Sequence, residues 1–450
     1  MIKRTAYTIL MLLTSCLISA QSIASHSQLK VISSILKELD YEWLISEEDF
    51  KTMIIVPLNK EYFSYIDPTS YAGGTYNILW DINYGKVRET EIRDYLYARV
   101  YDYVFDESLG TWEKGDEKTS RPLTLSNSSA FNAGLESMLK NMIIKGEYEN
   151  GKLYYKTIGN TVVRIDGIEE GSNIYGPLQM ENNAPLQVVE TFVDRGCRVL
   201  VVDAPIMGAR KSVDMLLREK PELSKFAEIV SECCSSTSSP KDKLTAASYG
   251  GGNLFYSYYQ YDDWDRGKIA YKYLLNDFHY TLYAPTNVAM EKAFAKGLPT
   301  IEDLRAAEKY DIQTTGEVGD STYRVKTVMI DFVRYHLQDF SLFVDKGAKS
   351  GKYNTAKNIL EYNSYREYYT AYRPYRLNVD VSESSLRVTD ALGNTYNVVT
   401  NAGLYNMVAN EYWINNSNCV EKASTVVVHA INGPLMYSED QFIYKYRRIE

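Results

Sequence analysis

The sequence predicts an α+β fold in two tandem copies of one sheet-and-helix design. Residues 280–294 begin as a strand of alternating side chains, stop at Pro285, which has no backbone N–H to give, and continue as a helix. The same strand-Pro-x-Asn pattern occurs at residues 54–59. Apolar stretches that lead into a proline, at residues 196–207 and 425–435, supply a matching last strand for each copy. A diverged tandem repeat accounts for all four stretches.

Length and composition fit two ordinary domains. The chain has 450 residues, of which 45% are apolar, and this is enough for two cores. The formal net charge of −9 argues against nucleic acid as a partner, because nucleic-acid-binding surfaces are basic. The 40 tyrosines have two explanations. Tyrosine serves binding surfaces, through a large ring with a polar tip, and it also serves half-exposed strand faces.

The N-terminus is predicted to be a targeting segment. A short basic stretch precedes an apolar run centred on residues 9–13, which is too short to span a bilayer. The following Leu-Thr-Ser-Cys matches a bacterial lipoprotein processing site. We therefore expect residues 1–25 to be a signal peptide and short tether, with lipid attached to Cys16. Ordinary signal cleavage after Ala20 or Ser25 is the alternative. No later stretch is apolar enough to span a membrane, so the only expected membrane contact is this lipid anchor.

The other cysteines do not indicate a metal site. They are Cys197, Cys233, Cys234 and Cys419, and their spacing lacks the Cys-x-x-Cys or Cys/His patterns typical of zinc. The neighbours Cys233 and Cys234 are poorly placed to pair with each other, because disulfide geometry is awkward there. Export permits other pairings, isolated buried thiols fit the sequence as well, and the pairing stays open.

The first domain is predicted to cover residues 27–208. Its expected elements are a helix at 29–39, strands at 54–59 and 95–104, a loop at 106–118, a helix at 135–143 and a last strand at 196–207. The helices follow from apolar stripes, the strand at 95–104 from alternation that gives one apolar face, and the loop from its two glycines.

The second domain is predicted to cover residues 209–450. Its expected elements are a helix around Pro221, a turn-rich insertion after it, the strand and helix at 280–294, a helix that includes 332–337 and a last strand at 425–435. The extra residues fall before the middle helix in the first copy and after it in the second. Asn141 and Met142 stand where the second copy has Tyr335 and His336.

These stretches resemble the fasciclin domain family in three places. Ala-Pro-Thr at 284–286 resembles the family's strand ending before a short helix, Tyr335-His336 its helix with a Tyr-His pair, and Pro434-Leu435 its closing sequence. The family motif residues in this chain would be Pro285, Thr286, Asn287, Tyr335, His336 and Pro434. In the first copy, Val-Pro-Leu replaces Ala-Pro-Thr.

The resemblance implies both a fold and a function. Each domain would be a wedge-shaped mixed β-sheet packed with small helices. The protein would be a non-enzymatic adhesion or partner-binding protein without a cofactor, anchored by lipid in a bacterial cell envelope at the outer membrane. Its ligand would be a protein or a glycan at the cell surface. The main alternative is a glycan-capture module of a nutrient-uptake system. A hydrolase is a third class, and it would need a deep cleft with converging acids.

Histidines and acidic residues offer weak candidates for chemistry. His26, His279, His336 and His429 could form a metal cluster or supply a catalytic base, but a structural role is favoured. His336 on an amphipathic helix and His429 in a valine-rich strand are expected to be packed polar groups with one hydrogen-bond partner each. Residues 262–267 faintly resemble a calcium loop, although a solvated turn fits better because an arginine stands at a ligand position. The sequence therefore predicts no metal site.

A tyrosine- and arginine-rich stretch at residues 362–376 is the predicted partner surface. Its tyrosines at 362, 365, 369 and 372 would share one helical face, and Pro374 would end that helix. Tyrosine and arginine are enriched at binding hot spots. The residues expected to bind a partner are Tyr365, Arg366, Tyr372 and Arg373. The alternative is that the tyrosines pack on their own domain.

Overall fold

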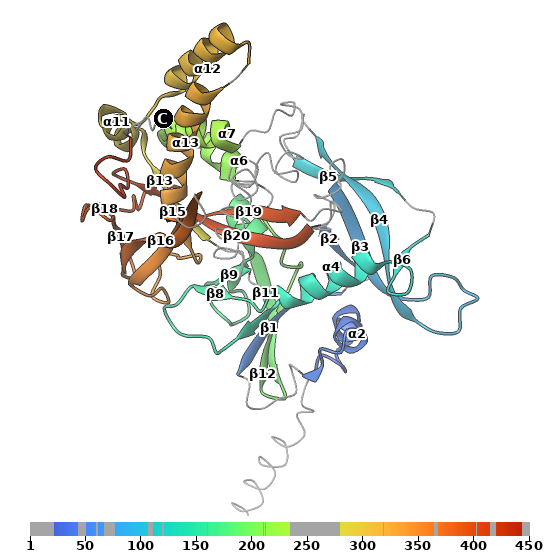
Figure 1. Ribbon diagram of the computed structural model, residues 1–450. Helices are drawn as coiled ribbons and strands as arrows, with labels where there is room; N and C mark the ends of the chain where they lie inside the picture. Colours follow the sequence, from blue (N-terminus) through green and yellow to red (C-terminus); the bar gives the residue numbers. More distant parts are fainter. Residues whose placement is uncertain are drawn as a thin grey trace, which may run out of the picture.

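In the computed structural model, the described residues form two units, each with its own sheet (Figure 1). They are 22–43, 51–59, 62–66, 77–106, 111–118, 121–159, 161–209, 211, 213–234, 280–317, 319–363, 368–401, 403–414 and 420–442. The predicted lipidation site Cys16, residues 262–267, His279 and Cys419 lie outside them. In this part of the chain, no helix is both long and apolar enough to span a membrane.

The first unit combines one seven-stranded mixed sheet with a second sheet and a few helices. Its elements are α2 (Lys30–Glu38), β1 (Thr52–Pro57), β2 (Phe63–Ile66), β3 (Asn77–Gly85), β4 (Tyr95–Asp106), β5 (Thr111–Glu117), β6 (Leu123–Thr124), α4 (Ser129–Lys140), β7 (Ile143–Lys145), β8 (Tyr154–Lys156), β9 (Val162–Ile165), β10 (Asn173–Tyr175), α5 (Pro177–Asn182), β11 (Leu186–Asp194) and β12 (Cys197–Val202). The seven strands run in the order β7-β1-β12-β11-β10-β9-β8, and β2 to β5 form the second sheet, with β6 paired to β4.

The second unit has one eight-stranded sheet and longer helices. Its elements are α6 (Val213–Arg218), η2 (Pro221–Leu223), α7 (Ser224–Cys234), β13 (Tyr280–Pro285), α11 (Asn287–Ala295), α12 (Ile301–Thr315), α13 (Asp320–Tyr335), β14 (Leu337–Asp339), β15 (Gly351–Asn363), β16 (Tyr368–Val381), β17 (Leu386–Thr389), β18 (Thr395–Asn397), β19 (Met407–Ile414) and β20 (Val420–Ile431). The strand order is β18-β17-β16-β15-β14-β13-β20-β19.

The two units repeat the same four-strand core. In each, the strand that ends in proline is antiparallel to the short strand after the middle helix and parallel to the last strand. The last strand is in turn antiparallel to the strand that precedes it, β11 or β19. The central residues of these ladders are Ile143, Ile54 and Val199 in the first unit and Leu337, Leu282 and Val428 in the second. The predicted α+β tandem repeat is therefore present in the strand pairing itself.

This register also aligns the middle helices. The Ile55 N–H donates to the Met142 carbonyl at 2.9 Å, and the Tyr283 N–H donates to the His336 carbonyl at 3.0 Å. Met142 thus occupies the place of His336, as the sequence comparison predicted. In the first unit, the separate sheet β2 to β5 lies between β1 and the middle helix, where the sequence predicted extra residues.

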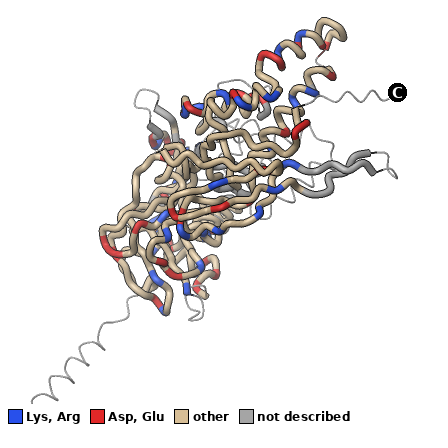
Figure 2. Tube along the Cα trace, turned by 90° about the vertical axis from the view of Figure 1, so that its left-hand side faces the viewer, with Lys and Arg blue, Asp and Glu red and all other residues tan. Residues whose placement is uncertain are grey.

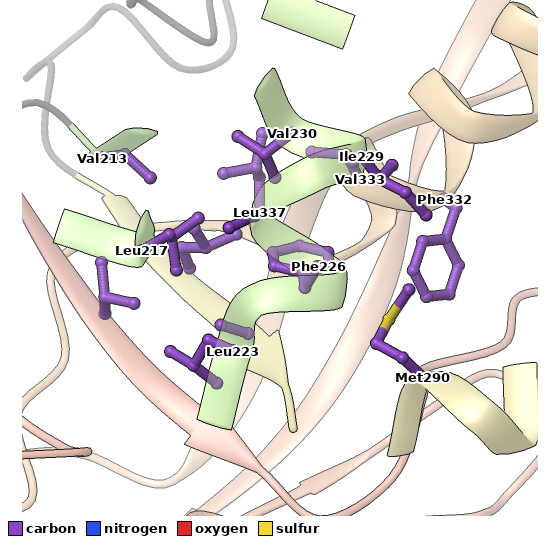
Figure 3. Close-up of a cluster of buried hydrophobic side chains, with 14 of the residues drawn as sticks. Val213, Leu217, Leu223, Phe226, Ile229, Val230, Met290, Phe332, Val333 and Leu337 are labelled. Carbon is purple, nitrogen blue, oxygen red and sulfur yellow. The ribbon is translucent and has the colours of Figure 1, made fainter. Parts of the chain in front are cut away.

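Each sheet nearly closes around an apolar interior, and helices cover its outer side. A bridge between Ile144 and Thr157 links the two ends of the seven-stranded sheet, and one between Val398 and Ile431 draws β18 towards β20. The apolar clusters on the helix side are separate in the two units. In the second unit, Phe226 of α7 and Phe332 of α13 meet in that cluster (Figure 3).

One predicted loop is a strand. Residues 106–118 were expected to be irregular, but β5 occupies most of them and pairs with β4. Gly115 lies at an irregularity of this pairing, and a Cβ there would approach the Val104 side chain to 3.1 Å. The glycine therefore marks a bulge within a hairpin and not a chain break. Val104 itself is 54% exposed, so the apolar face of β4 ends before it.

The predicted tyrosine-rich helix at residues 362–376 is also wrong. The chain there completes β15 and forms β16, and Tyr362 pairs with Tyr369 across the hairpin. Pro374 lies inside β16 beside a shift in register, where a strand tolerates proline. Tyrosine is a good strand former, and the long antiparallel partner decides the conformation. The spacing of the tyrosines by three and four residues therefore does not indicate a helix.

The strand-to-helix element at the centre of the second unit forms as predicted. β13 ends at Pro285, Thr286 is the N-cap, and α11 follows. Met290 and Ala293 are buried, but Val288 is 69% exposed instead of packed. The buried face of α11 is narrower than its apolar sequence suggested.

Candidate functional site

A pocket of about 610 Å³ lies where the two units meet. We name it the inter-unit pocket. The first unit supplies Tyr154 and Lys156 from β8 and Val162 from β9. The second unit supplies the segment that follows β14, and Tyr353 of β15. The lining residues of that segment include Phe340, Leu342, Phe343, Asp345 and Lys349. Its size and its mixture of aromatic, aliphatic and charged side chains are typical of ligand sites, which also favour the junctions between domains.

Asp345 fixes the second unit against the first. Its carboxylate is buried and accepts hydrogen bonds from the Leu153 N–H, at 3.1 and 3.3 Å to its two oxygens, and from the Tyr154 N–H at 3.2 Å. Backbone donors of β8 thus compensate the charge without a cation. Such charge-assisted bonds are stronger than neutral ones, so the carboxylate orients one unit on the other.

An aromatic stack forms the floor of the junction. The rings of Tyr154 and Phe343 lie 3.9 Å apart between centroids at 16°. Burial raises the pKa of the Tyr154 phenol to about 12, and its oxygen accepts a hydrogen bond from Asn406 Nδ2 at 3.2 Å. Val162, Val408 and further apolar residues pack beside the stack. The floor is therefore apolar, neutral and built from both units.

Phe340 is an exposed aromatic residue in a strained conformation at the pocket rim. Its φ is 67° and its side chain is 48% exposed. Left-handed backbone is rare for bulky residues and costs roughly 1–2 kcal/mol. Thr281 holds it there, because its hydroxyl donates to the Phe340 carbonyl at 2.7 Å and accepts from the Leu342 N–H at 2.9 Å. Strain of this kind concentrates at functional sites.

His429 holds the next turn of the same segment. Its Nε2 lies 2.8 Å from the Leu342 carbonyl, to which it donates, and its Nδ1 accepts from the Asn406 N–H at 3.2 Å. The Asn406 side chain in turn bonds both backbone groups of Val344. Complete burial lowers the pKa of His429 to about 4, so the ring is neutral at pH 7. It has two partners, not the single one that the sequence suggested.

His336 is the second buried histidine of this unit. Its Nδ1 donates to the Phe332 carbonyl at 2.8 Å, and its Nε2 accepts from the Leu435 N–H at 3.1 Å, next to the buried Pro434. Burial lowers its pKa to about 3. The two bonds again define a neutral ring. His336 ties the end of α13 to the segment after β20, and it is not part of the pocket lining.

The other motif residues connect elements. The Tyr335 hydroxyl accepts from the Ala391 N–H at 2.8 Å, and its ring packs edge-on against Tyr375 and Tyr437. Burial raises the pKa of the Tyr335 phenol. Asn287 Nδ2 donates to the Pro221 carbonyl of η2 at 2.8 Å, and its Oδ1 accepts from the Lys225 N–H at 3.0 Å, which holds the start of α7.

The structure describes no side chain of the four residues predicted to bind a partner. Tyr365 and Arg366 lie outside the described residues, and for Tyr372 and Arg373 only the β16 backbone is described. No group of three or more His, Cys, Asp or Glu in the described part of the chain is placed to hold a metal ion. Cys197 is a buried free thiol whose pKa burial raises to about 12, which makes it unreactive.

Sequence reasoning missed the inter-unit pocket. Its residues come from two short strands and one irregular segment, and no motif spacing joins Tyr154 to Phe343. One signal was available. Thr281 and His429 are polar residues at inward positions of strands that are otherwise apolar, and such residues need buried partners.

Comparisons with known proteins give only distant likenesses to solved structures. No family model matches the chain, and no curated protein matches it. Among solved structures, a domain pair from the insect cell adhesion molecule fasciclin I is 11% identical, with a TM-score of 0.22. The match covers 70% of this chain and 83% of that chain. The tandem repeat described above stands on the strand pairing of this chain alone.

Proposed function

We propose that this chain is a non-enzymatic adhesion or partner-binding protein of a bacterial cell envelope, lipid-anchored at the outer membrane, and that it binds its ligand in the inter-unit pocket. The observation that carries the proposal is Phe340, an aromatic side chain that is held exposed at the rim by strained backbone. A purely structural segment gains nothing from that arrangement, whereas a binding site gains a fixed apolar surface.

The chemistry of the lining supports binding over catalysis. Asp345 is the single carboxylate among the described lining residues, and four backbone hydrogen bonds already occupy it. General acid–base catalysis needs a group that is free to exchange a proton with a substrate. Lys349 of the lining is exposed and supplies charge for recognition.

The ligand site is tested by removing the ring at the rim. Phe340→Ser in the full-length lipoprotein should reduce binding to bacterial or host cell surfaces by at least tenfold. Tyr310→Ser is the matched control, because Tyr310 is 60% exposed on α12 and does not line the pocket. Equal binding by both variants and the parent protein would place the ligand elsewhere.

The anchor is tested separately. Cys16→Ala should release the protein from the membrane fraction, and labelled fatty acid should enter the parent protein but not the variant. Absence of label from the parent protein would show that ordinary signal cleavage applies.

The β15–β16 hairpin is a second candidate for partner contact. Tyr372 and Arg373 lie in β16, and Tyr365 and Arg366 fall between the two strands in the sequence, outside the described residues. Arg366→Glu with Arg373→Glu, and in a separate variant Tyr365→Ser with Tyr372→Ser, should lower binding without changing the melting temperature. A large fall in melting temperature with intact binding would show instead that the tyrosines pack in the core of their own domain.

The alternative function is glycan capture for nutrient uptake, which the aromatic lining also suits. A glycan array run beside a cell-adhesion assay separates the two. Binding to soluble oligosaccharides with no effect on adhesion would favour capture.

A further inference from the structure

We propose that one end of the seven-stranded sheet is a phospholipid-binding site, in which Arg198 binds the phosphate of a headgroup and the first unit thereby docks on the membrane. This inference rests on the lipid anchor of the proposed function, which brings this end of the chain to a bilayer. Three observations support it: a pocket with apolar walls, an arginine without a partner in the described structure, and the path of the chain from Cys16.

The pocket lies at the end of the sheet where β1 and β12 begin, and its volume is about 280 Å³. We name it the sheet-end pocket. Its lining includes Met53, Tyr148, Ile168 and Val193. Met53 belongs to the apolar cluster on one face of the sheet, and Tyr148 and Ile168 pack against that cluster. Val193 at the edge is 52% exposed. These walls offer apolar surface to the part of a lipid next to its headgroup.

Arg198 ends an otherwise apolar row of side chains. Alternation along β12 places it on the same face as Leu200 and Val202, which belong to the same apolar cluster. Within the described part of the chain, its half-buried side chain forms no hydrogen bond or ion pair. The other charged residues of the described lining, Lys51 and Glu147, pair with each other at 3.1 Å. One positive charge is left, and the planar guanidinium group of arginine can bind two phosphate oxygens at once.

The chain that follows the proposed anchor meets the sheet beside this pocket. The Ile23 N–H donates to Asp194 Oδ2 at 2.9 Å. Asp194 belongs to the turn between β11 and β12, and its neighbours Val193 and Gly196 line the pocket. Cys16 precedes Ile23 by seven residues, which span about 24 Å at full extension. A lipid on Cys16 therefore keeps the sheet-end pocket close to the headgroup layer.

A general attraction between protein and membrane does not explain this arrangement. The chain has a net charge of −9, and both signs are interspersed along its trace (Figure 2). An anionic membrane surface therefore does not attract the protein as a whole. Binding then depends on one arginine in one pocket. Docking by this end directs the second unit away from the membrane, because β12 and α12 lie at opposite ends of the molecule (Figure 1).

The first test divides a phospholipid into its two parts. The full-length lipoprotein in maltoside detergent at pH 7 is mixed with dimyristoylphosphatidylglycerol, with dimyristoylglycerol, which lacks the phosphate, or with glycerol 3-phosphate, which lacks the chains. Native mass spectrometry measures the fraction bound. The phospholipid should bind at least tenfold more tightly than either part. Equal binding of dimyristoylglycerol would show that the phosphate is not recognised, and equal binding of glycerol 3-phosphate would show a site for free phosphate. Either result overturns the inference.

Variants locate the contact. Arg198→Gln should lower phospholipid binding at least tenfold without changing the melting temperature. Arg195→Gln is the matched control and should bind as the parent protein does, because Arg195 pairs with Asp194 at 3.3 Å and is not among the described lining residues. Val193→Asp changes only the exposed edge and should also weaken binding, so it replaces Arg198→Gln if that variant does not fold. Full phospholipid binding by a folded Arg198→Gln or Val193→Asp variant overturns the inference.

Docking is tested in vesicles that contain the lipoprotein. A tryptophan is introduced at an exposed valine of either unit, as Val193→Trp or as Val288→Trp on α11. Phospholipids brominated on their acyl chains should quench the added fluorescence of Val193→Trp and leave that of Val288→Trp unchanged. Equal quenching of the two, or none in either, overturns docking by this end.

The outcomes separate this inference from the proposed function. Fatty acid label on Cys16 with no phospholipid bound overturns the site and leaves both the anchor and the inter-unit pocket standing. Phospholipid binding that depends on Arg198, in a protein that carries no label, supports the site and contradicts the anchor.

Discussion

The two units place different side chains at equivalent positions of the same four-strand core. The strand register matches Met53 with Thr281, Ile55 with Tyr283, Ile144 with Gln338 and Leu200 with His429. All eight are buried. The first unit thus fills this layer with apolar side chains, and the second fills it with polar ones.

The difference between the two layers corresponds to what their side chains contact. In the second unit, Thr281 and His429 bond the backbone of the segment after β14, and the Tyr283 hydroxyl donates to Gln338 Oε1 at 2.7 Å. A buried polar group destabilises a fold unless it is satisfied, so an apolar layer is the simpler solution where only packing is needed. We infer that the second unit has polar residues in this layer because they position the segment after β14 that lines the inter-unit pocket.

The largest expected effect is acid destabilisation of the second unit. Burial lowers the pKa of His336 to about 3 and that of His429 to about 4, while both histidines titrate near pH 6.5 when unfolded. Below pH 6.5 the unfolded chain therefore binds more protons, and stability falls as the pH drops towards 4. Between pH 6.5 and pH 5, each histidine should cost roughly 2 kcal/mol.

Asp339 opposes this trend to a smaller extent. Burial raises its pKa to about 6, so the folded state takes up this proton first, and stability rises as the pH falls from 6 towards 4. The net loss at pH 5 should be about 3 kcal/mol. Urea unfolding at pH 7, 6 and 5 measures it, with His336→Met/His429→Leu as the control whose stability should not fall between pH 7 and pH 5. Stability of the parent protein that stays constant or rises over this range would contradict the prediction.

The next largest effect is expected for His429→Leu, which installs the residue of the first unit. It leaves the Leu342 carbonyl and the Asn406 N–H without their ring partner and should cost about 3 kcal/mol at pH 7 in urea unfolding. It should also weaken ligand binding, because the segment after β14 loses the hydrogen bond that His429 makes to the Leu342 carbonyl. Unchanged binding in a less stable protein would show that Thr281 alone holds the segment.

A smaller and purely structural effect is expected for His336→Met. Met142 occupies the equivalent position, and the change removes the bonds to Phe332 and Leu435. The cost should be about 2 kcal/mol, within the range of 1–3 kcal/mol for unpaired buried groups. Ligand binding per folded molecule should stay as in the parent protein. Lost binding with full stability would instead make His336 a functional residue.

The sequence predicted the repeated core because that core depends on local signals. Proline at a strand end, an N-cap threonine and apolar alternation act over a few residues, and the residues 280–294 contain all three. The extra strands were harder to predict, since the identity of β5 and β16 depends on a partner strand that local spacing does not reveal. Tyrosine serves helix faces and strands alike, which explains the error at residues 362–376.

The pocket could not be predicted for a related reason. Tyr154 and Asp345 are brought together by the way the two units meet, and no pattern within either unit specifies this contact. The sequence did show polar residues in apolar strands. The role of Thr281 and His429 follows from their hydrogen bonds to the segment after β14, which only the structure shows.

The smallest stability effect, and the sharpest test of the comparison, is expected for Phe340→Gly. Glycine adopts a φ of 67° without strain, which should return up to about 1–2 kcal/mol. Its greater freedom in the unfolded chain and the lost contact with Tyr353 offset roughly 0.5–1 kcal/mol or more. The variant should therefore be as stable as the parent or up to about 1 kcal/mol more stable in urea unfolding, yet bind ligand at least tenfold more weakly. Phe340→Ala keeps a Cβ in the left-handed region and should be less stable than Phe340→Gly, with the same binding loss. This pattern would show that the phenyl ring is kept for recognition at a cost in stability. If Phe340→Gly and Phe340→Ala are instead both much less stable than the parent protein, the ring supports the fold, and the polar layer of the second unit serves packing after all.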